Sequence, residues 1–293
     1  MWISRVNMPY VKAKIKTSDG AVEDRISDLP SNVISNILER LPLCEAIRTS
    51  SLSKQWRMHW VSMSELVFDH KFFADAYQSR PQDMSSVEML IGKILLHHHG
   101  TVQKFLLHIP EWFGHSLDIN PWISYVSRNS VKELSIRGSL SQPKLTVPLY
   151  LFCCVELVRL ELSSFIFSLP PAFKGFKNLI SFKAASVRFS PDSLGILIAN
   201  CPMLVFLHLS RCKGVNFIGG QKLKWILVQG LFEYISVRDS QDLAYVHIDT
   251  GTLNSTAGSQ QDMKCNVIEG LTNLRKIEML HLRGNICKVG DTL

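Results

Sequence analysis

Apolar residues recur along most of this chain in a six-residue pattern whose first, fourth and sixth positions are apolar. The clear copies follow one another between residues 131 and 279: Val131-Leu134-Ile136, Leu157-Leu160-Leu162, Leu179-Phe182-Ala184, Leu204-Leu207-Leu209, Leu223-Ile226-Val228, Leu243-Val246-Ile248 and Leu274-Ile277-Met279. Two weaker copies precede them, Met63-Leu66-Phe68 and Val102-Phe105-Leu107. Side chains two positions apart lie on one face of an extended chain, so each hexad predicts a short strand with one buried face.

The spacing of these hexads indicates a repeat architecture. Successive fourth positions lie 26, 22, 25, 19, 20 and 31 residues apart. Most of these intervals fall in or beside the ~20–29 residues of leucine-rich repeats. One such repeat cannot bury its apolar face alone, so the repeats must stack into a curved parallel sheet whose other face is available to a ligand. The long last interval contains a Gly-, Ser- and Thr-rich run at 249–262, which we expect to be a flexible inserted loop.

Helical signals lie between some of the predicted strands. Ser85-x-x-Glu88 is a capping-box pattern, and the apolar face that follows it ends near Gly100. Asn120-Pro121 and Ser190-Pro191 each place a cap and a proline before a short apolar helix. We therefore expect helices or short strands on the convex side to return the chain from one strand to the next.

The chain before the repeats has a helical pattern. An amphipathic helix is predicted from Asp28 to Leu41 and ends at Pro42. A second short helix is predicted over Cys44–Ser50, and Ser53 can cap a third helix that contains Trp56 and Trp60. Three such helices make too small a core to be stable alone, so we expect them to pack on a partner or on the following domain.

Composition excludes several classes of protein. The 293 residues are 46% hydrophobic and 19% charged, which excludes a mostly disordered chain. The net charge of +7 would suit nucleic acid, but the basic residues are dispersed, so we expect no nucleic-acid partner. The uncharged stretch Ser193–Ser210 is interrupted by Asn200 and Pro202, so it predicts a turn between two short elements and not a membrane span.

The cysteine pattern and the N-terminal residues indicate the cellular compartment of the protein. The seven cysteines are odd in number and form no C-x-x-C pair, which predicts reduced, buried thiols in an intracellular protein. Residues 1–22 read as a flexible leader, and Met1–Lys16 contains no continuous apolar run, so no secretory signal is expected. Nucleus and cytoplasm both remain open.

Residues 23–61 closely resemble the F-box. The resemblance rests on Asp28-Leu29-Pro30, on Leu41-Pro42-Leu43 and on Trp56-Arg57. With the repeats, Asn200-Cys201-Pro202 and Phe232-Glu233-Tyr234-Ile235, the whole chain resembles the plant F-box/FBD/LRR-repeat proteins. The implied fold is α+β: a three-helix F-box at 23–61, then a leucine-rich-repeat solenoid at 62–293. The C-terminal FBD region common in this family is not found before Leu293, which is consistent with a naturally short array or with a truncated sequence.

The resemblance implies a substrate receptor of an SCF-type cullin–RING ubiquitin ligase. The F-box would bind a Skp1-like adaptor, which connects to the cullin and RING subunits, while the repeats bind a target protein for ubiquitination. The expected adaptor contacts are the apolar residues in excess of what three helices can bury: Leu29, Pro30, Ile34, Leu38, Leu41 and Pro42. The expected F-box core is Val33, Ile37, Ala46, Ile47, Leu52 and Trp56. Such a protein raises the effective concentration of its target and has no catalytic residues of its own.

Candidate target contacts lie between the core positions of the strands. They are Arg159, Glu161, Lys183, His208, Lys224, Trp225, Tyr245 and His247. Their mixture of charged and aromatic character suits a protein ligand, and a small-molecule co-ligand within the arc is equally permitted. Trp225 and Tyr245 are the first expected anchors, because aromatic residues dominate binding hot spots.

Other chemistry has little support in the sequence. His97-His98-His99 would end a helix, where imidazoles suit the helix dipole, and three consecutive side chains point in different directions, so no metal site is expected. The sequence contains no nucleophile-elbow, Walker A or dinucleotide-binding motif, so we expect neither enzymatic activity nor a bound cofactor. The alternative to a ligase subunit is a leucine-rich-repeat interaction scaffold without ligase function.

Overall fold

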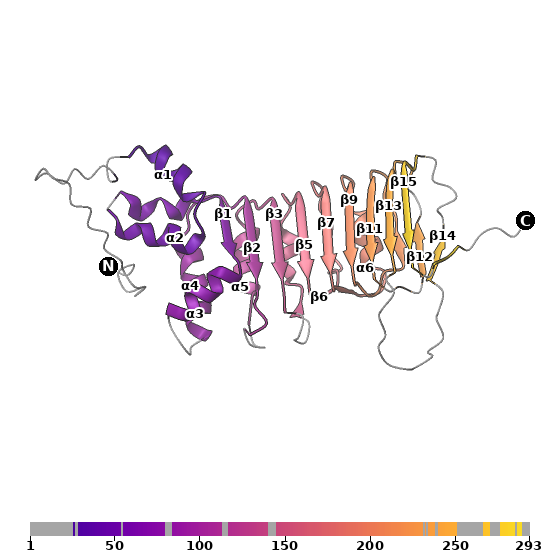
Figure 1. Cartoon of the computed structure of the whole chain (residues 1–293), viewed down its shortest axis with the longest axis horizontal. Helices are drawn as coiled ribbons and strands as arrows, with labels where there is room; N and C mark the ends of the chain where they lie inside the picture. Colours follow the sequence, from indigo (N-terminus) through magenta and orange to yellow (C-terminus); the bar gives the residue numbers. More distant parts are fainter. Residues whose placement is uncertain are drawn as a thin grey trace, which may run out of the picture.

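A computed structural model of the chain comprises a helical N-terminal unit followed by a repeat solenoid (Figure 1). It describes residues 26, 29–53, 55–79, 84–112, 117–139, 145–230, 232, 234–237, 240–250, 266–269, 276–284 and 286–288. The predicted leader at 1–22, the start of the first predicted helix at Asp28 and residues 251–262 of the predicted loop lie outside the described residues.

The N-terminal unit consists of short helices and 3₁₀ turns. These are α1 (Ser31–Leu38), α2 (Leu43–Arg48), η2 (Thr49–Ser51), η3 (Trp56–Met58) and η4 (Trp60–Ser62). Pro30 and Pro42 stand directly before α1 and α2, where proline's fixed φ suits a helix start and its missing N–H leaves no bond unmade. The third predicted helix is present as the two 3₁₀ turns η3 and η4, because the backbone closes i to i+3 bonds there, from His59 N to Trp56 O and from Ser62 N to His59 O.

The repeats form one nine-stranded parallel sheet, in the order β1-β2-β3-β5-β7-β9-β11-β13-β15. Its strands are β1 (Glu65–Phe68), β2 (Lys104–His108), β3 (Glu133–Arg137), β5 (Arg159–Ser163), β7 (Ser181–Ala185), β9 (Phe206–Ser210), β11 (Trp225–Gln229), β13 (Tyr245–Asp249) and β15 (Met279–Arg283). From β1 to β13 the fourth residue of each predicted hexad pairs with the fourth residue of the next, as Leu134 does with Leu160. The predicted fold class is confirmed, and both weaker hexads form strands.

The last predicted hexad is wrong by three residues. Val246 of β13 pairs with Leu280 and not with Ile277, so the hexad in use is Ile277-Leu280-Leu282. The sequence contains two overlapping apolar hexads at this point, and only the register of the neighbouring strand distinguishes them. Leu274 lies outside the described residues.

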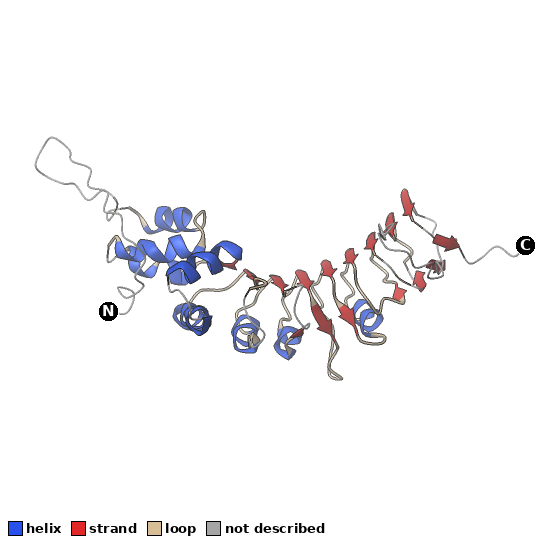
Figure 2. Ribbon diagram, turned by 60° about the horizontal axis from the view of Figure 1, so that its bottom comes forward, coloured by secondary structure: helices blue, strands red, loops and turns tan. Residues whose placement is uncertain are grey.

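The chain returns between strands through helices or short strands. The helical elements are α3 (His70–Ser79), α4 (Met84–His97), α5 (Asn120–Ser127), η5 (Leu149–Cys153) and α6 (Ser193–Ala199). One small parallel sheet contains β4 (Leu145–Thr146), β6 (Phe165–Phe167) and β8 (Arg188–Phe189); another contains β10 (Phe217–Ile218), β12 (Tyr234–Val237), β14 (Asn266–Glu269) and β16 (Ile286–Lys288). Figure 2 shows the helices on the outer side of the arc and the large sheet along its concave side.

The two units share one continuous hydrophobic core. Trp60, Val61 and Met63 at the end of the N-terminal unit are buried together with Leu66 of β1. The carbonyl of Val61 accepts hydrogen bonds from His99 N (2.8 Å) and from Gly100 N (3.2 Å), at the end of α4. The N-terminal unit therefore covers the first strand of the sheet and is joined to the repeats directly.

None of the helices in the described part of the chain combines the length and apolar character required to cross a lipid bilayer. The cysteines whose side chains are described are free thiols. Cys44, Cys154, Cys201 and Cys212 are buried, whereas the prediction of a buried thiol is wrong for Cys153, which lies on the exposed side of η5.

Candidate functional site

The first helix carries two apolar stripes, and only one of them faces the interior. Ile34 and Leu38 are completely buried, whereas Val33 and Ile37 are 36% and 37% exposed. The sequence analysis assigned Ile34 and Leu38 to the adaptor surface and Val33 and Ile37 to the F-box core. Both assignments are wrong, because the first pair is buried and the second pair is exposed. Both pairs are spaced i, i+4 on the same helix, so the apolar pattern cannot distinguish the stripe that faces the core from the one that faces solvent.

The segment before α1 is held in place by side chains from the η3 turn. Gln55 Nε2 donates to the carbonyl of Leu29 (2.9 Å), and Trp56 Nε1 donates to the carbonyl of Ile26 (2.9 Å). Leu29 is therefore half-buried against the core, while Pro30 stays exposed one turn before Val33. Pro30, Val33 and Ile37 follow one another at helical spacing and form what we call the α1 stripe.

The remaining predicted F-box residues divide between interior and surface. Ala46 and Trp56 are buried, and Ile47 is partly buried against the core. Leu52 is half exposed, so its assignment to the core is wrong; it lies in the turn after η2, where the chain leaves the helical packing. Of the predicted adaptor contacts in the loop between the two helices, Leu41 is partly buried and Pro42 is exposed.

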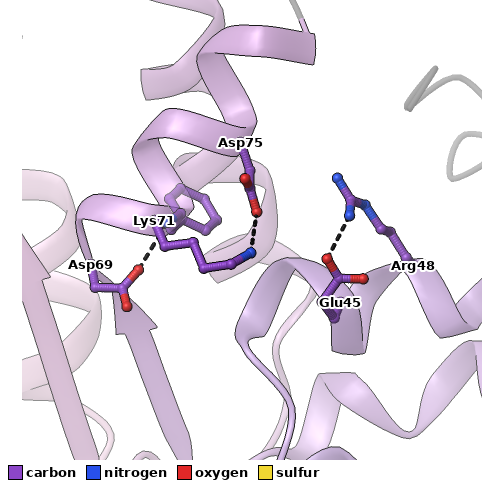
Figure 3. Close-up of polar contacts among 6 residues, drawn as sticks. Glu45, Arg48, Asp69, Lys71 and Asp75 are labelled. Atoms are coloured by element: carbon purple, nitrogen blue, oxygen red, sulfur yellow. Dashed lines mark hydrogen bonds and ion pairs between the residues drawn. The ribbon is translucent and has the colours of Figure 1, made fainter. Parts of the chain in front are cut away.

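A hollow of ≈ 240 Å³ lies where this loop meets β1 and α3. Its walls include Pro42 and Cys44 on one side and Glu65, Asp69 and Asp75 on the other. Figure 3 shows that the ion pairs beside it stay within single helices: Arg48 with Glu45 (2.6 Å) and Lys71 with Asp75 (2.7 Å). Burial raises the pKa of the Cys44 thiol to about 12, so this cysteine is not a nucleophile at neutral pH.

The second candidate surface is the concave face of the large sheet. In each inner strand the second and fourth residues are buried in the core, so the first, third and fifth residues lie on the open face (Figure 2). Because the strands pair in register, residues at the same position in successive strands form rows that cross the sheet. The first-position row reads Glu65, Lys104, Glu133, Arg159, Ser181, Phe206, Trp225, Tyr245, Met279, and the third-position row reads Val67, Leu106, Ser135, Glu161, Lys183, His208, Leu227, His247, His281.

The part of the open face over β1–β5 is rich in ion pairs. Lys104 pairs with Glu65 (2.8 Å), Arg137 pairs with Glu161 (2.7 Å) and Arg159 pairs with Glu133. Predicted target contacts Arg159 and Glu161 are therefore each engaged with a neighbouring strand. A hollow of ≈ 250 Å³ over β2–β7 is lined by these same charged residues.

The part of the open face over β9–β15 is rich in aromatic residues. The rings of Trp225 and Tyr245 are stacked with centroids 3.7 Å apart and planes 8° from parallel. Phe206 precedes Trp225 in the same row, and Lys183 Nζ lies 5.8 Å from the centre of the Phe206 ring. The structure thus brings five predicted contacts together on one face: Lys183, His208, Trp225, Tyr245 and His247; Lys224 is exposed directly before β11.

Sequence reasoning missed three residues of this surface: Phe206, Met279 and His281. Phe206 and Met279 extend the aromatic row, and the His281 ring lies 5.8 Å from that of His247. Phe206 could have been found as an apolar residue at an open-face hexad position. The other two were missed because the last hexad was placed three residues too early.

His98 has both ring nitrogens engaged inside the protein. Met63 O can only accept, so Nε2 carries the proton and donates to it (2.7 Å). The unprotonated Nδ1 faces the Tyr125 hydroxyl (2.9 Å), whose single proton is shared between Nδ1 and the carbonyl of His98 (3.1 Å). Burial lowers the pKa of this histidine. Within the described ranges, no three His, Cys, Asp or Glu side chains are grouped as a metal site would require.

Comparison with known proteins agrees with this two-part architecture. The F-box domain model matches residues 26–68, and the model for the LRR repeats of FBD-associated F-box protein At5g56370 matches residues 119–293. Together these matches cover both the helical unit and most of the solenoid.

Similar curated proteins come from Arabidopsis thaliana. F-box/FBD/LRR-repeat protein At1g13570 is 33% identical over 262 residues, which cover 89% of this chain and 62% of the relative. F-box/LRR-repeat protein At3g26922 is 28% identical over 69% of this chain and 64% of the relative, and F-box protein At4g09920 is 30% identical over 66% and 61%. The chain thus spans about three fifths of the length of these relatives. Because the F-box and the repeats occur on one chain in this order, the protein belongs to the family of FBD-associated F-box proteins with leucine-rich repeats.

Proposed function

We propose that this protein is the substrate-recognition adaptor of an SCF-type cullin–RING ubiquitin ligase. Its family indicates a protein-interaction adaptor, and no enzymatic family is indicated. In this proposal the N-terminal unit binds a Skp1-like adaptor, which recruits the cullin and RING subunits, and the open face of the sheet binds the target. The observation that carries the proposal is the presence of an exposed apolar stripe on the F-box and an open sheet face on one continuous core.

The α1 stripe is the surface that we assign to the Skp1-like adaptor. Pro30, Val33 and Ile37 are exposed apolar side chains on a helix whose opposite stripe is fully buried. Exposed apolar residues grouped on one helix face favour a protein interface. The Gln55 and Trp56 hydrogen bonds hold the chain before the helix, so this surface is already shaped before the partner binds.

The direct packing of the two units gives the proposal its mechanism. A target on the sheet would be held at a fixed position relative to the bound adaptor, because the core and the Met63–His98 hydrogen bond join the units. A fixed position raises the local concentration of target lysines near the ubiquitin-charged E2. The chain then needs no acid, base or nucleophile of its own.

Adaptor binding can be tested with two variants of one helix. Val33→Asp/Ile37→Asp places charge on the exposed stripe and leaves Ile34 and Leu38 in the core. We expect at least about a tenfold rise in the Kd for a recombinant plant Skp1-like protein, since interface hot spots cost ~2 kcal/mol or more. Asn36→Asp, at an exposed position on the same helix, is the control and should bind as wild type does.

The outcome separates the two candidate functions. Equal adaptor binding by the double variant, with unchanged circular dichroism, would refute the assignment of the α1 stripe. If the wild-type chain does not bind the adaptor at all, the protein is a leucine-rich-repeat scaffold without ligase function. Ubiquitin transfer by the purified chain with charged E2 and no cullin or RING subunit would refute the non-catalytic role.

We also propose that the protein acts inside the cell, in the nucleus or the cytoplasm. The free thiols at Cys44, Cys154, Cys201 and Cys212 support this, because buried reduced cysteines are typical of a reducing compartment. Imaging of the full chain fused to a fluorescent protein in plant cells tests it, and secretion into the apoplast would contradict it.

A further inference from the structure

The open face of the sheet changes character at β7. Over β1–β5 its charged residues pair across neighbouring strands, as Glu65 does with Lys104. From β9 to β15 the first-position row is apolar and aromatic, with Phe206, Trp225, Tyr245 and Met279 in succession, after Ser181 on β7. A ligand over β1–β5 must compete with existing ion pairs, whereas a ligand over β7–β15 can bury aromatic surface.

The charges on the open face over β7, β9 and β11 are basic. The open-face positions of β7, β9 and β11, together with the residue before each strand, include no acidic residue, but they do include Lys183 and Lys224. In the described part of the chain, no carboxylate lies within ion-pair distance of Lys183. Asp242, the acid that interacts with Lys224, is already hydrogen-bonded to Lys276 (2.6 Å). Among the acidic residues of the open face, Glu161 lies opposite Lys183 on β5 and is ion-paired with Arg137, while Asp249 lies on β13 and Glu278 directly before β15.

A buried nitrogen on the same stretch has no hydrogen-bond partner. His208 lies between Lys183 and Leu227 in the third-position row, and its Nε2 is buried and unpaired. An unpaired buried polar atom costs free energy, and a turn of the partly exposed His208 ring toward the open face would let an incoming group supply the missing bond. A carboxylate can accept a hydrogen bond from an imidazole N–H and can pair with Lys183.

Resting on the proposed function, we infer that the target is recognised through an acidic peptide segment that also carries apolar or aromatic side chains. Its apolar residues lie on the row from Phe206 to Tyr245, and its acidic residue lies at Lys183 and His208. Lys183 is 5.8 Å from the Phe206 ring, so the acidic and apolar residues of the ligand are neighbours. The ion-paired part over β1–β5 makes little contribution to affinity.

Single-stranded nucleic acid also binds aromatic and basic surfaces, and the ring geometry argues against it. Bases bind by stacking on the faces of aromatic rings. Here Trp225 and Tyr245 stack on each other 3.7 Å apart, so each covers one ring face of the other. Their free edges suit the packing of aliphatic and aromatic side chains, which favours a peptide.

Selection from a random peptide display library with the full chain tests the inference. We expect enriched peptides to combine Asp or Glu with neighbouring Leu, Phe, Tyr or Trp. A synthetic copy of an enriched peptide, measured by fluorescence anisotropy, should bind Trp225→Ala and Lys183→Glu at least about tenfold more weakly than wild type. The matched control Glu133→Ala/Arg159→Ala, which removes an ion pair from the other part of the face, should change the Kd less than about twofold.

The inference would be overturned if the selection enriched no peptides or enriched basic ones. It would also be overturned if Trp225→Ala or Lys183→Glu bound the peptide with wild-type affinity, or if the control variant lost affinity tenfold. Tighter binding of single-stranded RNA than of any peptide would overturn it as well. None of these variants touches the α1 stripe. Retained adaptor binding with a failed peptide selection therefore refutes this inference alone, whereas lost adaptor binding with a successful selection refutes only the ligase role.

Discussion

At the scale of single residues, His98 joins the F-box to the repeats. Its ring bridges the carbonyl of Met63 and the hydroxyl of Tyr125, and it is neutral in the folded protein because burial lowers its pKa. When this imidazole gains a proton, the charge stays in the interior, where it is costly. The folded state therefore disfavours the protonated form that the unfolded chain adopts freely.

This difference predicts a pH-dependent stability. The unfolded chain binds the proton near the ordinary histidine pKa of about 6.5 and the folded chain binds it only below that, so the contribution of His98 is complete above pH 6.5. It is lost as the pH falls through the lower, folded pKa. Thermal melts between pH 7.5 and 5.5 should show Tm falling in the wild type, with a smaller fall in His98→Gln, whose amide can still donate to Met63 O. A slope in His98→Gln equal to that of the wild type would contradict this, while His97→Gln, at an exposed position, should keep the slope.

Single residues also show which assignments could be made from sequence patterns and which could not. The double Leu-Pro and the Trp-Arg identified the F-box, and Ala46 and Trp56 were placed in the interior. The choice between the Val33 and Ile34 stripes was wrong, because a helix with apolar residues at both i and i+1 has two candidate faces. Only the packing of the rest of the hydrophobic core decides between them.

At the scale of elements, consecutive repeats meet through backbone as well as side chains. Gly175 has a φ of +90°, and a Cβ at this position would lie only 1.9 Å from the carbonyl oxygen of Asn200. Asn200 Nδ2 donates to Ile196 O (2.8 Å) and thus fixes the end of α6 at this contact. The Asn200-Cys201-Pro202 motif therefore sets the distance between two neighbouring repeats.

We expect Gly175→Ala to lower the free energy of unfolding by roughly 1–3 kcal/mol, since the new methyl group requires both a strained φ and a backbone shift. Gly92→Ala in α4 is the matched control. A Cβ there meets nothing within 4 Å, so the helix should gain about 0.5–1 kcal/mol. Urea titration of both variants measures the difference, and equal midpoints would show that this contact has no role in repeat stacking.

Elements with a strong period were the most predictable. The hexads from Leu66 to Val246 gave strands in the expected register, because a slip by one residue would expose every core side chain. One prediction failed where the period was ambiguous, the last hexad, where Ile277 fits two patterns, and the third F-box helix takes the tighter 3₁₀ form. In both places contacts from other segments decide the conformation.

At the scale of the whole molecule, the F-box serves as the end cap of the solenoid. Terminal repeats need a cover for their apolar side; here α2 lies beside β1 (Figure 1), and Trp56 and Trp60 are buried in the core that includes Leu66 of β1. This shared core predicts that the F-box and the first repeats unfold together.

Leu38→Ala tests this coupling. The change removes a fully buried side chain and should cost ~2–5 kcal/mol. We expect hydrogen exchange to become faster in β1 and β2 as well as in α1. Ile37→Ala, on the exposed stripe, should leave exchange in all three elements close to wild type. Faster exchange in α1 alone would show that the two units unfold independently.

Because the F-box packs directly on the first strand, the number of strands sets the distance between the F-box and a site farther along the sheet. The sheet order places β11 six strand steps from β1, which is about 29 Å at ~4.8 Å per step. A cargo protein bound over Trp225 therefore lies about that distance from the position of a cargo protein bound over β1. Gain or loss of a single repeat between them would move the cargo by ~5 Å and rotate it with the twist of the sheet. In the proposed ligase role, paralogues with identical docking residues but different repeat counts would present different lysines of the same cargo for ubiquitination.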